Sequence, residues 1–100
     1  MTEIPTTRIL KPSVSSESVL VIDVRYQEEY SGEHVNGAIN IPYTMIAEEI
    51  GKYTTDKAQE ILLYCRSGAR AEIALVTLND LGYINVENIG GYDQAKAQLE

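Results

Sequence analysis

The stretch Ile61-Leu62-Leu63-Tyr64-Cys65-Arg66-Ser67-Gly68-Ala69-Arg70 carries the main information on the fold of this chain. Its first four residues have the length and apolar character of a strand that is covered on both faces. The remainder is a short loop, and a helical pattern begins directly after it. The chain's one cysteine, Cys65, is therefore expected at the carboxyl end of a strand, which is where ligands bind in open α/β sheets.

The surroundings of Cys65 are those of a reactive thiol. Backbone N–H groups at a helix N-terminus and the guanidinium groups of Arg66 and Arg70 favour ionised sulfur, which is the nucleophilic form. Packing in a core is the commoner fate of a lone cysteine in a strand, but an inert core thiol needs no positive surroundings. The pattern therefore favours chemistry at Cys65 over a packing role.

Strands and helices alternate along the chain. Strands are predicted at 9–10 (an edge strand), 19–22, 38–41, 61–64 and 84–86, with Gly90-Gly91 as a turn. Helices are predicted at 26–31, at 44–50 with Thr44 as N-cap, through the apolar positions 71, 74, 75, 78 and 81 up to Gly82, and at 92–99. This alternation predicts one α/β domain over residues 1–100, with residues 1–8 as a flexible tail. It has three layers: a mainly parallel sheet with helices on both faces.

Composition narrows the functional classes. The 100 residues are 44% hydrophobic and 23% charged, as in soluble globular domains, and the net charge of −7 disfavours binding to nucleic acid or to an anionic membrane. One cysteine and one histidine allow neither an internal disulfide nor a zinc cluster. Without a membrane-spanning or signal-like segment, we expect a cytoplasmic monomer, or a periplasmic one if a signal peptide has been removed.

An ordered set of motifs resembles the single-domain rhodaneses, a family of sulfurtransferases. The motifs are, in chain order, Ile22-Asp23-Val24-Arg25, Glu29-Tyr30, His34, Gly37-Ala38-Ile39-Asn40-Ile41-Pro42, the loop from Cys65 to Arg70, Leu81-Gly82-Tyr83 and Gly90-Gly91. Two further segments, Glu33-His34-Val35-Asn36-Gly37 and Val86-Glu87-Asn88, look most similar to the small phage-shock-protein-E type of thiosulfate sulfurtransferase. Known members of that type are periplasmic.

The resemblance implies a ping-pong thiosulfate sulfurtransferase that needs no cofactor and no metal. Cys65 would be the catalytic nucleophile: it takes the outer sulfur of thiosulfate or a similar anionic donor, becomes a persulfide, and passes the sulfur to cyanide or a thiol, including a protein thiol. The substrate-binding residues would be Arg66, Ser67, Gly68, Ala69 and Arg70. Their N–H groups would curl around the sulfur, Gly68 would adopt φ > 0, and the arginines would hold the donor.

Several positions outside the loop are also interpreted. Ala71 stands where the family usually has Ser, so a hydroxyl is missing and the rate is expected to be modest. Tyr92 follows the Gly-Gly pair at the place of a common Trp. Asp23, Arg25 and His34 are expected to be structural, because buried charges need partners and a thiolate needs no general base.

Three other functions are compared with the sulfurtransferase. A Cys-dependent phosphatase or arsenate reductase has five residues between its Cys and Arg, whereas four separate Cys65 from Arg70. A thioredoxin-like redox function requires a second cysteine. A persulfide carrier or protein-interaction module with little activity on free thiosulfate would also keep Cys65, and the sequence leaves this alternative open.

Overall fold

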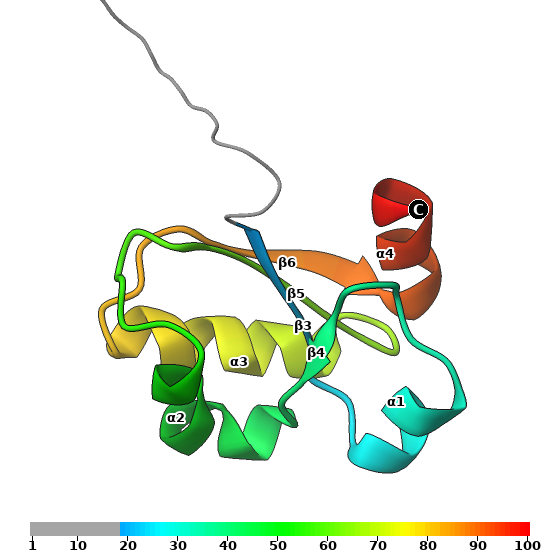
Figure 1. The fold of residues 1–100 in the computed structure, drawn as a ribbon, viewed down its shortest axis with the longest axis horizontal. Helices are drawn as coiled ribbons and strands as arrows, with labels where there is room; N and C mark the ends of the chain where they lie inside the picture. Colours follow the sequence, from blue (N-terminus) through cyan, green and yellow to red (C-terminus); the bar gives the residue numbers. More distant parts are fainter. Residues whose placement is uncertain (1–18) are drawn as a thin grey trace, which may run out of the picture.

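The computed structural model describes residues 19–100, so the predicted tail and the edge strand at 9–10 lie outside the described residues. Within this part, four strands form one sheet in the order β4-β3-β5-β6, and all neighbouring strands are parallel (Figure 1). The strands are β3 (Val19–Asp23), β4 (Ile39–Asn40), β5 (Glu60–Cys65) and β6 (Val86–Gly91). The predicted α/β class with a parallel sheet is confirmed.

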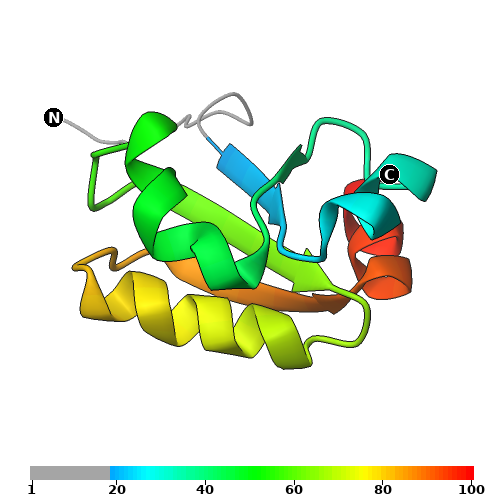
Figure 2. The same cartoon turned by 90° about the horizontal axis from the view of Figure 1, so that it is seen from below.

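Helices cover both faces of this sheet. They are α1 (Gln27–Gly32), α2 (Ile46–Glu49), α3 (Ala69–Asp80) and α4 (Tyr92–Leu99), and the 3₁₀ turns η2 (Tyr43–Met45) and η3 (Ile50–Lys52) flank α2. Figures 1 and 2 show α2 and α3 on one face and α4 on the other, while α1 lies near the carboxyl ends of the strands.

Alternate residues of the central strands fill two apolar layers. Ile22 and Leu63 belong to the layer under α2 and α3, together with Leu78. Tyr64, the next residue along β5, belongs to the opposite layer with Ala95 of α4. Because successive side chains of a strand point to opposite faces, a strand covered on both sides needs a continuous apolar run. The packing therefore explains why 61–64 contains no polar residue.

The predicted strand at 84–86, with a turn at Gly90-Gly91, is wrong at both ends. Strand β6 begins at Val86 and includes both glycines, and Ile84 is 79% exposed. Gly91 pairs with Cys65 after a register shift in β5. A Cβ atom at Gly91 would collide with the carbonyl oxygen of Arg66. This glycine is therefore needed for close approach of two backbone segments, not for a turn.

Thr44 is not a helix N-cap. The helical turns begin with η2, directly after Pro42, where the N–H of Met45 donates to the Pro42 carbonyl at 2.8 Å. Pro42 has the restricted φ of proline, −53°, which suits the entry into a helical turn. The turns also continue through Gly51 to Lys52, past the predicted end at residue 50.

The predicted end of the long helix is confirmed. Gly82 has φ +103°, its N–H donates to the Asn79 carbonyl, and the N–H of Tyr83 donates to the Leu78 carbonyl, both at 3.0 Å. This is a Schellman motif, which satisfies carbonyl groups that the helix end leaves free. It turns the chain back toward the start of β6.

Candidate active site

The loop that follows β5 is shorter than the sequence predicts. Cys65 is the last residue of β5, while Ala69 and Arg70 already belong to the first turn of α3. The connection is therefore residues 66–68. Gly68 is the N-cap of α3 with φ +100°, so the predicted positive φ at this glycine is confirmed.

The sulfur of Cys65 accepts two backbone hydrogen bonds from the start of α3. The N–H of Gly68 lies 2.9 Å from Sγ and that of Ala71 lies 3.4 Å from it. Cys65 is only 1% exposed, so the sulfur lies under the loop. Donors directed at one atom from a helix start stabilise negative charge there. Ala71, whose N–H is one of these donors, lies outside the predicted range 66–70. Its place in the first turn of the predicted helix could have indicated this role, because N–H groups there have no partner within the helix.

Strand β6 supports the loop from the side. The side-chain amide of Asn88 donates to the Gly68 carbonyl at 2.9 Å, and its oxygen accepts the N–H of Gly90 at 2.9 Å. Ser67 forms an antiparallel bridge with Gly91. Neither Asn88 nor Gly91 was predicted as a site residue, because their contacts with the loop depend on how β6 pairs with β5.

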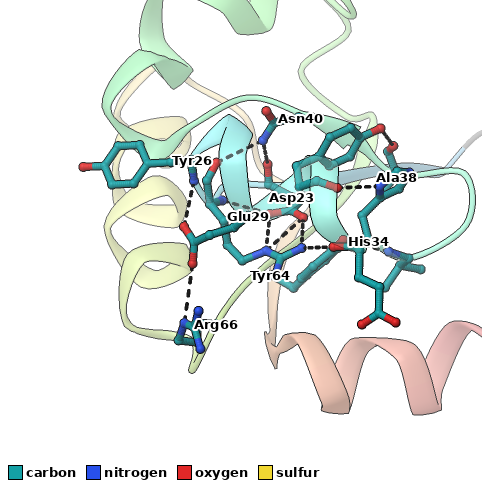
Figure 3. A network of polar contacts seen from close by, with 12 residues as sticks. Asp23, Tyr26, Glu29, His34, Ala38, Asn40, Tyr64 and Arg66 are labelled. Atoms are coloured by element: carbon teal, nitrogen blue, oxygen red, sulfur yellow. Dashed lines mark hydrogen bonds and ion pairs between the residues drawn. The ribbon is translucent and has the colours of Figure 1, made fainter.

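Two arginines, Arg66 of the connection and Arg70 of α3, contact the carboxylate of Glu29, a residue of α1. Arg70 donates to its two oxygens at 2.9 and 3.0 Å, and Nε of Arg66 lies 3.5 Å from Oε2. Figure 3 shows Glu29 between Arg66 and the backbone of Tyr26, whose N–H donates to it at 3.1 Å. The Arg70 hydrogen bonds are the main reason that the pKa of Glu29 is lowered to about 2. The carboxylate is therefore charged at neutral pH.

The residues Asp23 and Arg25 form a buried ion pair. Nη2 of Arg25 lies 2.6 Å from Oδ2 of Asp23, and Asp23 is 0% exposed (Figure 3). Arg25 also donates to the Glu33 carbonyl at 2.6 Å, and its guanidinium lies 5.0 Å from the centroid of the Tyr92 ring. These contacts join β3 to the segment after α1. They match the structural role predicted for the pair.

His34 makes packing and hydrogen-bonding contacts with α1. Its Nδ1 lies 2.8 Å from the Tyr30 carbonyl oxygen, and its ring stacks on the Tyr30 ring with centroids 3.8 Å apart. The structural role predicted for His34 agrees with these contacts.

Two further properties of residues 19–100 concern metal binding and membrane insertion. No group of three or more His, Cys, Asp and Glu side chains in this range is placed to hold a metal ion. No helix in the same range combines the length and apolar character needed to cross a bilayer.

Comparison with known proteins identifies the family. The Rhodanese-like domain family matches residues 6–98. The thiosulfate sulfurtransferase PspE of Escherichia coli is 44% identical over 70 residues, which are 70% of this chain and 67% of that protein. A solved structure described as a rhodanese with anions from E. coli superposes with a TM-score of 0.73 at 41% identity, covering 76% of this chain and 89% of the other. The chain belongs to the rhodanese family.

Another relative is considerably longer than the shared region. The putative sulfur carrier protein YrkF of Bacillus subtilis is 33% identical over 75 residues, which are 75% of this chain and 40% of that protein. The chain thus spans two thirds of one curated relative and less than half of the other.

Proposed function

We propose that this chain is a thiosulfate sulfurtransferase that carries sulfur as a persulfide on Cys65. The observation that carries the proposal is the Cys65 sulfur at the end of β5, with the N–H groups of Gly68 and Ala71 directed at it. The 44% identity to PspE supports thiosulfate as the donor. The arrangement can stabilise negative charge on the atom that gains and loses sulfur.

The first half-reaction is a displacement at the outer sulfur of thiosulfate. The Cys65 thiolate attacks this sulfur with its electron pair, a new S–S bond forms, and the bond from the outer sulfur to the sulfonate group breaks. Sulfite leaves with the electrons of that bond. The enzyme then holds a persulfide, with the negative charge on its outer sulfur and the N–H groups of Gly68 and Ala71 directed at its inner sulfur, Sγ of Cys65.

The second half-reaction removes the added sulfur. Cyanide or a thiolate attacks the outer sulfur of the persulfide, and the Cys65 sulfur leaves as a thiolate. The products are thiocyanate or a new persulfide on the acceptor. Because sulfite leaves before the acceptor binds, the kinetics are ping-pong.

The two loop arginines have different roles in donor binding. The Arg66 side chain is 76% exposed and its contact with Glu29 is long, at 3.5 Å, so we expect it to turn toward an incoming anion. The Arg70 side chain is 22% exposed and forms a two-point pair with Glu29. We therefore assign capture of the donor mainly to Arg66, while Arg70 supplies fixed positive charge beside the sulfur.

The test is an assay of the purified chain with thiosulfate and cyanide. We expect thiocyanate formation with ping-pong kinetics, and an added mass of about 32 Da, one sulfur atom, on Cys65 after treatment with thiosulfate alone. Absence of both the adduct and thiocyanate would refute the proposal.

A comparison of thiosulfate with a persulfidated protein as the donor distinguishes the alternative function, a persulfide carrier. The putative sulfur carrier YrkF among the relatives favours this alternative. A carrier would accept sulfur from a persulfidated protein far faster than from free thiosulfate. Turnover of free thiosulfate at equal or higher efficiency supports the enzyme.

The proposed chemistry implies the kinds of partner, and the compartment is a separate proposal. A small anionic sulfur donor and a thiol acceptor, including a protein thiol, are the partners that we propose, and the chain would act as a monomer. We propose the cytoplasm as its compartment, with the periplasm as the alternative. Fractionation of cells that express the full-length protein tests the compartment.

A further inference from the structure

We infer that Glu29 determines specificity for the charge of the sulfur donor, an inference that rests on the proposed function. In the free protein its carboxylate pairs with both loop arginines, at the place where an anionic donor needs them. A donor of high negative charge must compete with Glu29, whereas a neutral donor need not. Glu29 therefore lowers the affinity for dianions relative to uncharged sulfane donors.

The contacts show that Glu29 is held in this position. Its Oε1 accepts from both Arg70 and the backbone N–H of Tyr26, and its Oε2 accepts from Arg70 and faces Arg66. The Glu29 side chain is 20% exposed. A carboxylate bonded from three directions cannot easily turn away when a donor arrives.

The two ion pairs of Glu29 differ in strength, so a donor can displace the weaker one. The Arg66 contact is long, at 3.5 Å, and the arginine is largely in solvent, so it contributes little and breaks easily. The Arg70 pair has two short hydrogen bonds and is mostly shielded. A donor can take Arg66 away from Glu29, but it then lies near a carboxylate that stays on Arg70.

The ion pair lies next to the sulfur in the structure. Arg70 directly precedes Ala71, whose N–H lies 3.4 Å from the Cys65 sulfur, and Arg70 has a raised pKa chiefly because of its hydrogen bonds with Glu29. Two guanidinium groups and one carboxylate leave a single net positive charge beside the thiol. Removal of the Glu29 charge would raise this net positive charge from one to two. The resulting gain in affinity should grow with the negative charge of the donor.

The experiment compares three donors in Glu29→Gln: dianionic thiosulfate, monoanionic benzenethiosulfonate and zwitterionic 2-aminoethanethiosulfonate, whose net charge is zero and whose terminal sulfur is displaced with a sulfinate as the leaving group. Gln keeps an oxygen for the Tyr26 N–H and Arg70 but carries no charge. We expect KM for thiosulfate to fall about 5-fold to 20-fold and that for benzenethiosulfonate about 2-fold to 5-fold, with the smallest change for the zwitterionic donor. The gain should shrink at high ionic strength.

Two further variants separate charge from structure. Glu28→Gln makes the same charge change on the neighbouring exposed residue of α1 and should leave all three KM values unchanged. Glu29→Asp keeps the charge on a shorter side chain and should retain a KM for thiosulfate near the wild-type value. Equal shifts for all donors, or the same kinetics in Glu29→Asp and Glu29→Gln, would show that Glu29 only holds α1 against the loop.

Titration with sulfate provides a measurement that does not need turnover. Sulfate should bind Glu29→Gln about 5-fold to 20-fold more tightly than the wild type in calorimetry. If the wild type fails to turn over thiosulfate, the proposed function fails, and the sulfate titration still tests Glu29. Equal or weaker binding of sulfate by Glu29→Gln would overturn the inference.

Discussion

At the scale of single residues, the proposed chemistry depends on one atom, the Cys65 sulfur. The Cys65 sulfur lies in the apolar layer under α3 and yet accepts two backbone N–H groups. The apolar layer fixes its position, and the N–H groups stabilise its charge. These two requirements explain why a nucleophile can stand at a buried strand end, provided that a helix starts directly beyond it.

Cys65→Ser should abolish sulfur transfer without unfolding the protein. The serine hydroxyl is close in size and can accept the same N–H groups, but its much weaker acidity prevents formation of a nucleophilic anion, and it cannot form a persulfide. Thiocyanate production measures the first effect and a circular dichroism melt the second. Retention of a tenth or so of the wild-type activity would rule out Cys65 as the nucleophile.

Arg66→Ala and Arg70→Ala should both impair the use of thiosulfate but differ in stability. We expect kcat/KM to fall about 10-fold to 100-fold in each, roughly 1.4–2.7 kcal/mol of transition-state stabilisation. Only Arg70→Ala should also lower Tm, because only Arg70 has a shielded pair with Glu29. Unchanged kinetics in both variants would mean that backbone N–H groups alone bind the donor.

At the scale of elements, the site depends on contacts that join the loop to β6 and to α1. Asn88 and Gly91 of β6 contact the loop backbone on one side, and Glu29 of α1 binds its arginines on the other. The loop is therefore held between two elements that are distant in the chain. Small changes in either should be felt at the sulfur.

Gly91→Ala tests the contact with β6. Its Cβ would collide with the Arg66 carbonyl oxygen, so the loop must shift, at a cost of about 1–3 kcal/mol in unfolding free energy and with a loss of kcat/KM. Urea unfolding and the thiocyanate assay measure the two effects. Gly51→Ala is the matched control, because nothing lies within 4 Å of its Cβ position. If the two variants behave alike, close approach at Gly91 is unimportant.

The contact with α1 should appear in the pH dependence of stability. The pKa of Glu29 falls from 4.5 to about 2 on folding, so its stabilising contribution is complete above pH 4.5 and is lost as the pH falls toward about 2. In melts between about pH 5 and pH 3, Tm of Glu29→Gln should therefore fall less steeply than Tm of the wild type. Glu28→Gln should follow the wild type. An identical slope in all three proteins would contradict this assignment.

At the scale of the whole molecule, the parallel sheet brings the functional groups to one edge. Asp23 and Cys65 are the last residues of neighbouring parallel strands, so both lie at the same edge of the sheet (Figure 2). This is the edge at which ligands bind in open α/β sheets, and it is where we propose that the reaction takes place. Segments from opposite halves of the chain thus share one site.

The short connection between β5 and α3 predicts which anions the site excludes. Only residues 66–68 connect β5 to α3, and the N–H groups of Gly68 and Ala71 are directed at the Cys65 sulfur, so we expect too few donors to surround a phosphoryl group. We expect negligible hydrolysis of an aryl phosphate under conditions where thiosulfate turns over. Robust hydrolysis would favour the phosphatase alternative over the sulfurtransferase.

The sequence by itself determined the order of most elements, the class of fold and the position of Cys65, the proposed nucleophile, at the end of a strand. The apolar run at 61–64, the helical spacing after the loop and Gly82 are local patterns, and each depends on residues close in the chain. Local patterns failed where two apolar residues flank Asn85, and where glycine serves close packing. In both cases the neighbouring strand, not the local sequence, decides the outcome.

Only the tertiary structure decided what surrounds the sulfur. Glu29 lies 41 positions before Arg70 in the chain, and Asn88 lies 20 positions after Gly68, so no spacing rule joins them. Their contacts arise because parallel pairing of β3, β5 and β6 places α1, the loop and the end of β6 at one edge. Strand order and register decide which side chains meet through sheet pairing, and neither can be read from a single sequence.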